Sequence, residues 1–319
     1  MIIWQIFDEG NQWEIEVGPI TILSGYDVQW YKLIRNIEDY FCNKSTIVDI
    51  FEDEEKLHKK DWECFFIPFD AHLQLDKLTA KSPLKPIIDE LSEEIYLSPT
   101  FNELIDFWHD LKDEIELLGK RVGKYNLKLE LSDFGIDNLK SHLTLKTFNN
   151  SMSPFDYKKL LLTLYGEKVI EKKRLILIEL PELYAEDNEF RELLQIIQQF
   201  SEKGVWFIII SQKRIDGNNN YIFKGKVINN AAIESIKRIV LNEVPFVCNE
   251  CQFNKAKNFL MNNVDNLYKV NNKISLSTGF KEDEIVVFFV LAKHLKLEVS
   301  IDVSGISPNL KEFIKTYSG

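Results

Sequence analysis

Residues 21–34 read TILSGYDVQWYKLI, in which a short apolar run enters a Ser-Gly turn and apolar residues then recur at helical spacing. This order of strand, tight turn and helix is the frame of a phosphate-binding loop. A working loop reads G-x-x-x-x-G-K-[ST], which requires a second glycine, a lysine and a hydroxyl after Gly25. The chain has Trp30, Tyr31 and Lys32 at those places. The frame of a nucleotide site is therefore present without its phosphate-binding residues.

A second informative stretch, RLILIELPELYAED, covers residues 174–187. Five apolar residues in a run of six predict a strand that is buried on both faces, as in a parallel sheet. A helical pattern follows, and GVWFIIISQK at 204–213 predicts the next buried strand. The order strand, helix, strand predicts a right-handed crossover between parallel strands.

The remaining elements complete an α/β pattern. Period-two alternation predicts an N-terminal hairpin within residues 1–17, and Gly217–Asn220 looks like a linker. Further predicted strands cover 45–51, 62–69, 125–132 and 143–148; predicted helices fill 75–119, follow Gly25, and cover 153–170. Beyond residue 220 we expect strands at 221–228 and 295–304 with helices between them.

This order of elements is that of the ATPase heads of ABC-type and chromosome-maintenance proteins. In that frame Glu179 stands at the metal-binding aspartate, and Leu180 stands at the catalytic glutamate. We therefore expect an α/β fold in which a degenerate ATPase head carries a helical insertion and a small C-terminal α/β domain. The expected boundaries are 1–74 and 120–216 for the head, 75–119 for the insertion and 221–319 for the C-terminal extension.

The substitutions remove the chemistry of nucleotide hydrolysis. Binding a triphosphate requires inward backbone N–H groups, a lysine on the β and γ oxygens and a hydroxyl on Mg²⁺. Lys32 comes one position late, about 100° around a helix, and so points elsewhere. Leu180 cannot orient water. We expect a protein that is not an enzyme and binds no nucleotide, with Trp30 or Tyr31 packed where phosphate would lie.

Charge is distributed unevenly along the chain. The formal net charge is −11, which taken alone argues against a nucleic-acid partner. Residues 118–174, however, hold twelve Lys or Arg against six Asp or Glu, so that segment carries +6 and the rest −17. A solvated set of surface lysines is one interpretation, and a local polyanion-binding surface is the other.

Targeting and cysteine patterns suggest a soluble cytoplasmic protein. The start MIIWQIFDEG lacks the basic region of a secretory signal, and the longest apolar run, IVVFFVLA at 285–292, is far shorter than a membrane span. Cys248 and Cys251 have the C-x-x-C spacing of zinc or redox sites. No second pair accompanies them, so we interpret them as free thiols.

The chain resembles the ring-forming adaptation protein of type II-A CRISPR loci. The resemblance rests on the degenerate GYDVQWYK loop, the long helical insertion, the LKLELSDFGIDNLKSHLTLK segment and the buried LILIELPEL strand, and it covers residues 1–216. It implies a homotetrameric ring that binds double-stranded DNA without sequence preference, prefers free ends and is stabilised by calcium. It also implies a role in spacer acquisition beside the CRISPR integrase pair and the effector nuclease, and no ATPase or nuclease activity.

Candidate site residues follow from the resemblance and from the charge pattern. The acidic run Glu130, Asp133 and Asp137 matches that of the family, and carboxylates are the hard oxygen ligands that calcium requires. We expect Asp133 and Asp137 to share a helix face, although an acid pair at a helix N-terminus explains them equally. The basic segment supplies the DNA-binding candidates Lys120, Arg121, Lys124, Lys128, Lys140, Lys172, Lys173 and Arg174.

Two alternatives stay open. The chain could be a degenerate ATPase-like scaffold for other proteins that does not bind DNA, or a nucleotidase with an unusual site. The sequence assigns no role to residues 221–319.

Overall fold

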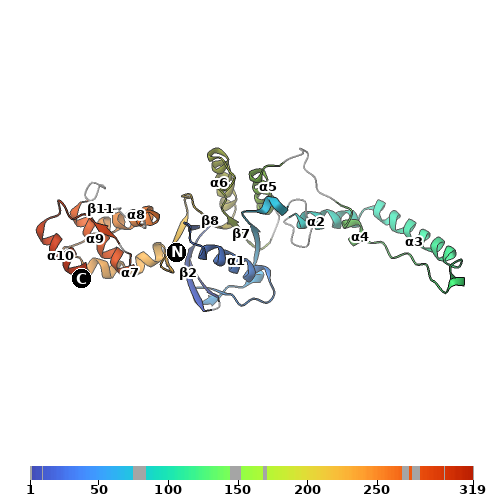
Figure 1. Ribbon diagram of the computed structural model, residues 1–319, viewed down its shortest axis with the longest axis horizontal. Helices are drawn as coiled ribbons and strands as arrows, with labels where there is room; N and C mark the ends of the chain where they lie inside the picture. The colour runs from blue at the N-terminus through green and yellow to red at the C-terminus, as the bar shows by residue number, and fades with distance from the viewer. Residues whose placement is uncertain are drawn as a thin grey trace. The chain divides into compact units, whose positions relative to one another are not determined.

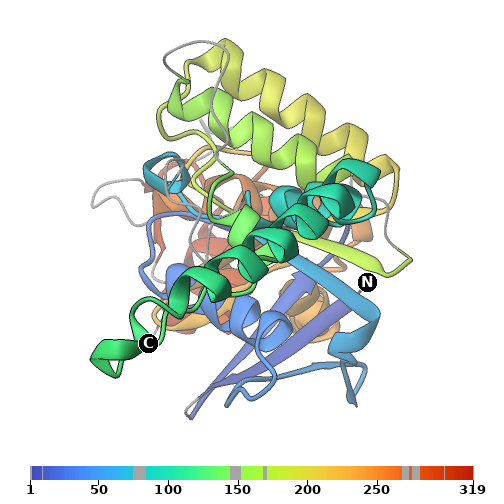
Figure 2. The ribbon, with the colours of Figure 1, turned by 90° about the vertical axis from the view of Figure 1, so that its right-hand side faces the viewer.

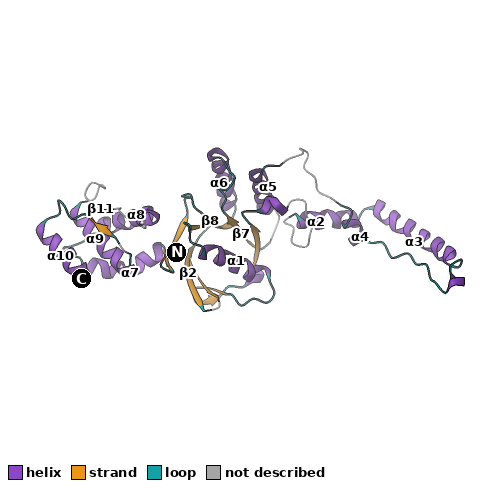
Figure 3. Cartoon of the chain, viewed as in Figure 1, coloured by secondary structure: helices purple, strands orange, loops and turns teal. Residues whose placement is uncertain are grey.

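The computed structural model describes residues 2–8, 10–74, 84–143, 152–167, 171–267, 273–274, 281–297 and 299–318. The chain divides into two units. One consists of Met1–Phe69 together with Leu162–Gly319, and the other is Asp70–Leu161. Figure 1 labels the elements, and Figure 3 distinguishes helices from strands.

A six-stranded sheet with the order β10-β9-β3-β8-β7-β6 forms the centre of the first unit. All neighbouring strands are parallel except β10, which is antiparallel to β9. The sheet confirms the predicted α/β class and both predicted buried strands. The strands are β3 (Ile20–Ser24), β6 (Trp62–Ile67), β7 (Lys173–Glu179), β8 (Val205–Ser211), β9 (Asn218–Phe223) and β10 (Lys226–Ile228).

Helix α1 (Gln29–Cys42) packs in one core with residues of two sheets. Its buried residues Trp30, Leu33 and Ile34 share a cluster with Leu175 of β7 and Ile208 of β8. The same cluster includes apolar residues of the antiparallel sheet β2-β1-β4-β5. That sheet contains the predicted N-terminal hairpin, and its strands are β1 (Ile2–Asp8), β2 (Asn11–Val17), β4 (Asp49–Glu52) and β5 (Glu55–Lys56).

Helix α6 (Asp187–Glu202) covers the other face of the parallel sheet, as Figures 1 and 2 show. It presents Phe190, Leu193 and Ile197 as its buried residues. Helix α5 (Pro154–Glu167) is preceded by Ser153, whose Oγ accepts a hydrogen bond from Asp156 N at 3.0 Å. Ser153 is therefore the N-cap of this helix.

The second unit is largely helical. It contains the short helix η2 (Ala71–Gln74), then α2 (Lys85–Tyr96), α3 (Pro99–Gly119), η3 (Gly123–Tyr125) and α4 (Ile136–Lys140). Ser98 Oγ caps helix α3 by accepting from Phe101 N, and the helix ends at Gly119, where the predicted helical stretch 75–119 ends.

The strand predicted at 125–132 is wrong. Residues 126–135 form a loop that is held to α3, because Trp108 Nε1 donates to Ser132 O at 2.9 Å and the Trp108 and Phe134 rings lie 4.9 Å apart. These side-chain contacts take the place of the strand pairing that the alternation suggested. The strand predicted at 143–148 falls almost wholly on 144–151, outside the described residues.

The central sheet extends into residues that the sequence analysis assigned to the C-terminal extension. Strand β9 pairs with β3 from Asn218 to Tyr221, so the predicted linker at 217–220 is wrong. The following residues are mainly helical rather than evenly α/β. Their elements are α7 (Asn230–Glu243), α8 (Glu250–Leu267), α9 (Glu282–His294) and α10 (Pro308–Ser318), with a short parallel pair β11 (Lys273–Ile274) and β12 (Ser300–Ile301).

Helix α9 is the core of this C-terminal part. Every residue from Ile285 to Ala292, the longest apolar run of the sequence, is buried in a cluster shared with α7, α8 and α10. The run is apolar because the helix is surrounded by others. Among the described residues, no helix has both the length and the apolar character that a membrane span requires.

Candidate functional site at the carboxyl edge of the parallel sheet

The loop after β3 has the backbone shape of a phosphate-binding turn. Gly25 has a φ of +99°, which favours glycine, and its N–H donates to Ser211 O at 3.1 Å. Trp30 is fully buried, and its Nε1 donates to Ser24 O at 2.9 Å. The side chain at the second-glycine position therefore packs into the core and holds the start of the loop; that Trp30 or Tyr31 takes the place of phosphate stays a prediction.

Lys32 points away from this edge, as the sequence predicts. Its Nζ lies 3.7 Å from a carboxylate oxygen of Asp8 on β1. Asp8 is buried and also accepts a hydrogen bond from Asn11 Nδ2 at 2.7 Å. The positive charge of Lys32 thus partly neutralises the buried Asp8 carboxylate of the N-terminal hairpin.

Arg35 binds the carboxylate that ends β7. Its Nε and Nη2 donate to the two oxygens of Glu179 at 3.0 and 3.1 Å. Glu179 is 1% exposed, and it also accepts from Phe69 N at 3.3 Å. The guanidinium carbon lies 4.3 Å from the centre of the Phe66 ring. A positively charged side chain thus occupies both oxygens of the residue at the metal-binding position, and a metal ion would have to displace it.

Glu182 and Ser211 at this edge are also paired within the protein. The Glu182 carboxylate accepts from Ser211 Oγ at 3.1 Å and from Gln212 N at 2.5 Å. Burial, followed by the charges of Glu179 and Glu182, raises the pKa of Tyr31 above its ordinary value. Leu180 follows Glu179 with a φ of +44°, and its aliphatic side chain can neither accept a proton nor orient water. The described edge thus has the strand and loop arrangement of a nucleotide site, but its polar side chains Arg35, Glu179 and Glu182 bind other groups of the protein.

Some of the basic residues predicted to bind DNA are exposed, and others are paired with protein groups. Lys120, Arg121 and Lys124 follow the end of α3 and are exposed, with no ion pair to a described carboxylate. Lys128 is paired with Glu130, and Lys140 Nζ lies 2.9 Å from Asp89.

The remaining three basic candidates precede or begin β7, in the first unit. Lys172 and Lys173 are exposed, and Lys173 Nζ lies 5.3 Å from the Trp62 ring centre. Arg174 is half-buried and donates to Gly166 O, and burial lowers the pKa of its guanidinium. Of the three, Arg174 is thus the least available to a ligand.

The acidic candidates do not form a common site. Glu130 is paired with Lys128, and Asp133 is paired with Lys112; these contacts lower the pKa of both carboxyls. Asp137 lies on α4, which begins at Ile136, so the expectation that Asp133 and Asp137 share a helix face is wrong. The described part of the chain contains no group of three His, Cys, Asp or Glu side chains able to hold a metal ion. The residues as arranged do not fit a complete calcium site.

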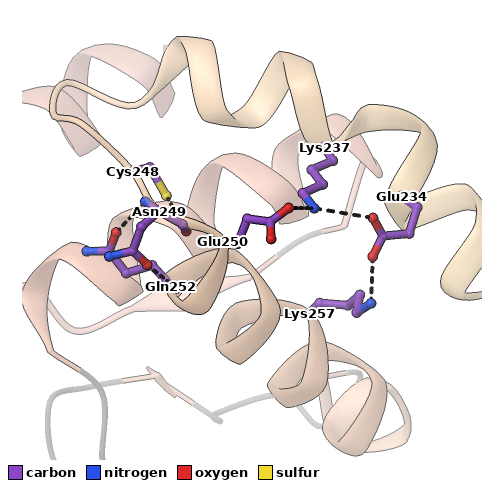
Figure 4. Close-up of polar contacts among 7 residues, drawn as sticks. All are labelled: Glu234, Lys237, Cys248, Asn249, Glu250, Gln252 and Lys257. Carbon is purple, nitrogen blue, oxygen red and sulfur yellow. Dashed lines mark hydrogen bonds and ion pairs between the residues drawn. The ribbon is translucent and has the colours of Figure 1, made fainter.

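The Cys248-x-x-Cys251 pair lies at the start of α8, and both thiols are free. Burial, followed by the nearby charge of Asp283, raises the pKa of Cys248. Figure 4 shows that the surrounding polar contacts join helices: Lys237 of α7 lies 2.7 Å from Glu250, and Lys257 of α8 lies 2.6 Å from Glu234. These ion pairs are structural contacts between α7 and α8.

Sequence reasoning missed the polar network around Asn220, which is fully buried on β9. Its carbonyl oxygen accepts from Glu16 N at 2.7 Å and from Asn229 Nδ2 at 3.0 Å, and its amide donates to Glu16 O at 3.0 Å. Asn229 caps α7 through Ala232 N at 2.9 Å. The network therefore joins the hairpin, the central sheet and the first C-terminal helix.

Two sequence signals could have revealed these residues. A buried strand that ends in an acid needs a counter-charge, which directs attention to Arg35 on the helix after the loop. The three asparagines precede YIF, and the whole stretch NNNYIF is one strand. Gly18 also indicates that another side chain lies close to its backbone, because a Cβ at Gly18 would be only 2.1 Å from Asn218 Oδ1.

The fold is similar to that of Stu0660 of Streptococcus thermophilus. Its crystal structure aligns with a TM-score of 0.57 at 14% identity and covers 99% of this chain and 100% of the other. The likeness shows a shared fold that includes the C-terminal helices. CbiO1 of Clostridium perfringens, part of an ABC transporter complex, aligns with a TM-score of 0.37 at 15% identity over 76% of this chain and 95% of its own. No protein-family model and no curated protein matches the sequence.

Proposed function

We propose that the protein binds double-stranded DNA without sequence preference, as a homotetrameric ring that favours DNA ends and supports CRISPR spacer acquisition. The observation that carries DNA binding is the exposed trio Lys120, Arg121 and Lys124, three cations within five residues and free of described carboxylate partners. The ring, the preference for ends and the role in adaptation rest on the resemblance to the type II-A adaptation family.

Duplex binding without sequence preference requires contacts to phosphates and none to bases. Exposed lysine and arginine side chains supply such contacts. The rest of the chain is strongly acidic, so its surface repels DNA and confines binding to the basic segment. Lys172 and Lys173 are further exposed candidates, whereas Lys128, Lys140 and Arg174 are already engaged with protein groups.

The proposal includes no nucleotide hydrolysis. It is supported by the contact between Arg35 and Glu179, in which a guanidinium holds both oxygens that a Mg²⁺ ion would use. It is also supported by Leu180, which offers no base for water. In this proposal the parallel sheet has a structural role and not a catalytic one.

Self-association is supported by apolar side chains on α3. Leu104, Phe107, Leu111 and Leu118 are 40, 68, 41 and 48% exposed. Their spacing of three, four and seven residues places them on one face of the helix. A second copy of the chain would cover this face, and shielding these side chains from water favours association.

Calcium binding stays part of the proposal on the strength of the resemblance. Glu130, Asp133 and Asp137 are exposed, but two of them are held by lysines. Calcium takes six to eight oxygen ligands, so an ion here would need further ligands from water or from another copy of the chain. The integrase pair and the effector nuclease of the locus are the proposed protein partners.

The direct test compares retention of linear and covalently circular duplexes of equal length at low salt. A ring that threads onto ends retains the linear form more tightly. Equal retention would contradict threading, and no retention of either form would favour the alternative of a protein–protein scaffold. Light scattering with and without calcium gives the assembly state, and a monomer in both conditions would contradict the ring.

A further inference from the structure

Two thiols meet where the end of α1 lies against the edge strand β6. Cys42 is the last residue of α1 and is exposed, whereas Cys64 is the third residue of β6 and is half-buried. Cys42 Sγ donates to Cys64 O at 3.8 Å. Two cysteines 22 positions apart in the chain thus lie side by side, with the Cys42 sulfur against the backbone of Cys64.

The surrounding packing fixes this contact. Trp62, Cys64 and Phe66 alternate along β6 and therefore point to the same face. Trp62 lies 5.9 Å from the Phe41 ring of α1, and Phe66 stacks against the guanidinium of Arg35, also on α1. Cys64 lies between these two anchor points, so α1 and β6 hold the thiols together.

The two thiols differ in character. The neighbouring Cys64 side chain lowers the pKa of the Cys42 thiol, although burial and the charges of Glu38 and Asp39 oppose this. Burial raises the pKa of Cys64 well above its usual range. An accessible thiol that ionises more readily, beside a second thiol that stays protonated, is the arrangement of a peroxide-reactive cysteine and its resolving partner.

We propose that Cys42 and Cys64 form an oxidation site that closes to an intramolecular disulfide when the protein meets hydrogen peroxide. The Cys42 thiolate attacks one peroxide oxygen, the O–O bond breaks, and the departing hydroxide takes up a proton to leave as water. The sulfur of Cys64 then attacks the sulfenic sulfur of Cys42. The S–S bond forms, and the displaced hydroxide leaves as water with the proton of Cys64. Two thiols lose two electrons and two protons, and peroxide becomes two waters.

The disulfide fastens the C-terminal end of α1 to the edge of the central sheet. We expect the Cys248 thiol to react more slowly than that of Cys42, because burial raises the pKa of Cys248. The chain therefore contains its own internal control, a second cysteine pair with closer sequence spacing, in which the Cys248 thiol donates to Asn249 O.

The test treats the reduced full chain with stoichiometric hydrogen peroxide and maps the products by mass spectrometry after alkylation and proteolysis. We expect a cross-linked peptide pair joining residues 42 and 64, reversed by dithiothreitol. Cys42→Ser and Cys64→Ser each abolish it, whereas the double variant C248S/C251S forms it as the wild type does. Circular dichroism checks that each variant is folded. The cross-linked peptide of the wild-type protein tests the proposal even if a variant fails to fold.

Three results would overturn the proposal. One is a Cys248–Cys251 disulfide formed first. Another is Cys42 oxidised to the sulfinic acid while Cys64 stays alkylatable. The third is a cross-link between two chains instead of within one, which non-reducing electrophoresis distinguishes.

Discussion

Arg35 on α1 holds both carboxylate oxygens of Glu179 at the end of β7, at 3.0 and 3.1 Å. The carboxylate is almost fully buried, and the arginine side chain is about half exposed. In the ATPase frame, the acid at this place would bind the metal of the nucleotide. Here its charge is neutralised by Arg35, which lies on the helix that follows the turn at Gly25. The helix after the turn is thus bonded directly to the acid at the end of β7.

Replacing Arg35 by methionine is expected to destabilise the fold, because it leaves a buried carboxylate without its counter-charge. The loss in free energy of unfolding should be about 1–3 kcal/mol, reduced by the exposure of the guanidinium. Urea denaturation measures it. Glu179→Gln alone should also be destabilising, whereas the double variant should recover about 1 kcal/mol relative to the sum of the singles. Additive losses would show that the two residues do not act as a pair.

Nucleotide binding should be absent. Titration calorimetry with ATP and Mg²⁺ is expected to give no saturable heat, because Arg35 occupies Glu179 and position 31 carries no lysine. Circular dichroism of the same sample confirms the folded state. Saturable binding that Arg35→Met strengthens would show that the edge still accepts a metal–nucleotide complex, in favour of the nucleotidase alternative.

Asn220 should be among the most sensitive polar residues of the fold. Asn220→Ala leaves the Glu16 backbone and the Asn229 amide without their partners, at a cost of about 2–3 kcal/mol in the free energy of unfolding. Asn219→Ala is the matched control, because Asn219 is only half-buried; its Oδ1 accepts from Ser24 Oγ at 2.9 Å, and its Nδ2 donates to Gly217 O at 3.0 Å and Ile215 O at 3.3 Å. Equal losses for the two variants in urea denaturation would contradict the role assigned to the network.

The contact of α10 with α7 should depend on pH. Tyr317 and His294 donate to Glu243, and these bonds lower the pKa of its carboxyl below the ordinary 4.5. A lowered folded-state pKa gives stability that is present above the unfolded value and lost as pH falls through the folded value.

Tyr317→Phe removes the main donor. It should therefore be less stable than the wild type at neutral pH, and the difference should shrink once the pH falls below about 4. Thermal unfolding followed across this range is the measurement, with Tyr96→Phe, an exposed tyrosine of α2, as the control. A difference that stays constant with pH would place the stabilisation elsewhere.

The predictable part of the fold was the part with strong periodicity. The apolar strands around Leu177 and Ile209 and the turn at Gly25 are determined by short-range patterns. The stretch 125–132 alternates like a strand, but contacts with Trp108 hold it as a loop. Alternation indicates which side chains can share a face and does not supply a neighbouring strand.

The candidate site was only partly predictable for a similar reason. The missing lysine and the leucine at position 180 are visible in the sequence, and they predicted altered chemistry. The partner of Glu179 is 144 positions away, and the partners of Asn220 lie on the N-terminal hairpin. Such pairs depend on how distant segments meet. The positions of Lys128 and Lys140 beside acids could not be inferred from charge counts either.

The most direct measurement of the central claim is the salt dependence of binding to a short linear duplex, followed by fluorescence anisotropy. The wild type should bind with a logarithmic affinity that falls linearly with the logarithm of salt concentration. A variant with Lys120, Arg121 and Lys124 changed to glutamine should bind more weakly, with a slope smaller by about 0.9 for each phosphate that the variant no longer neutralises. The control changes three lysines outside the basic segment, Lys203, Lys226 and Lys296, and should retain the wild-type slope. Wild-type affinity too weak to measure at low salt, or the same slope in all three proteins, would contradict DNA binding through this segment.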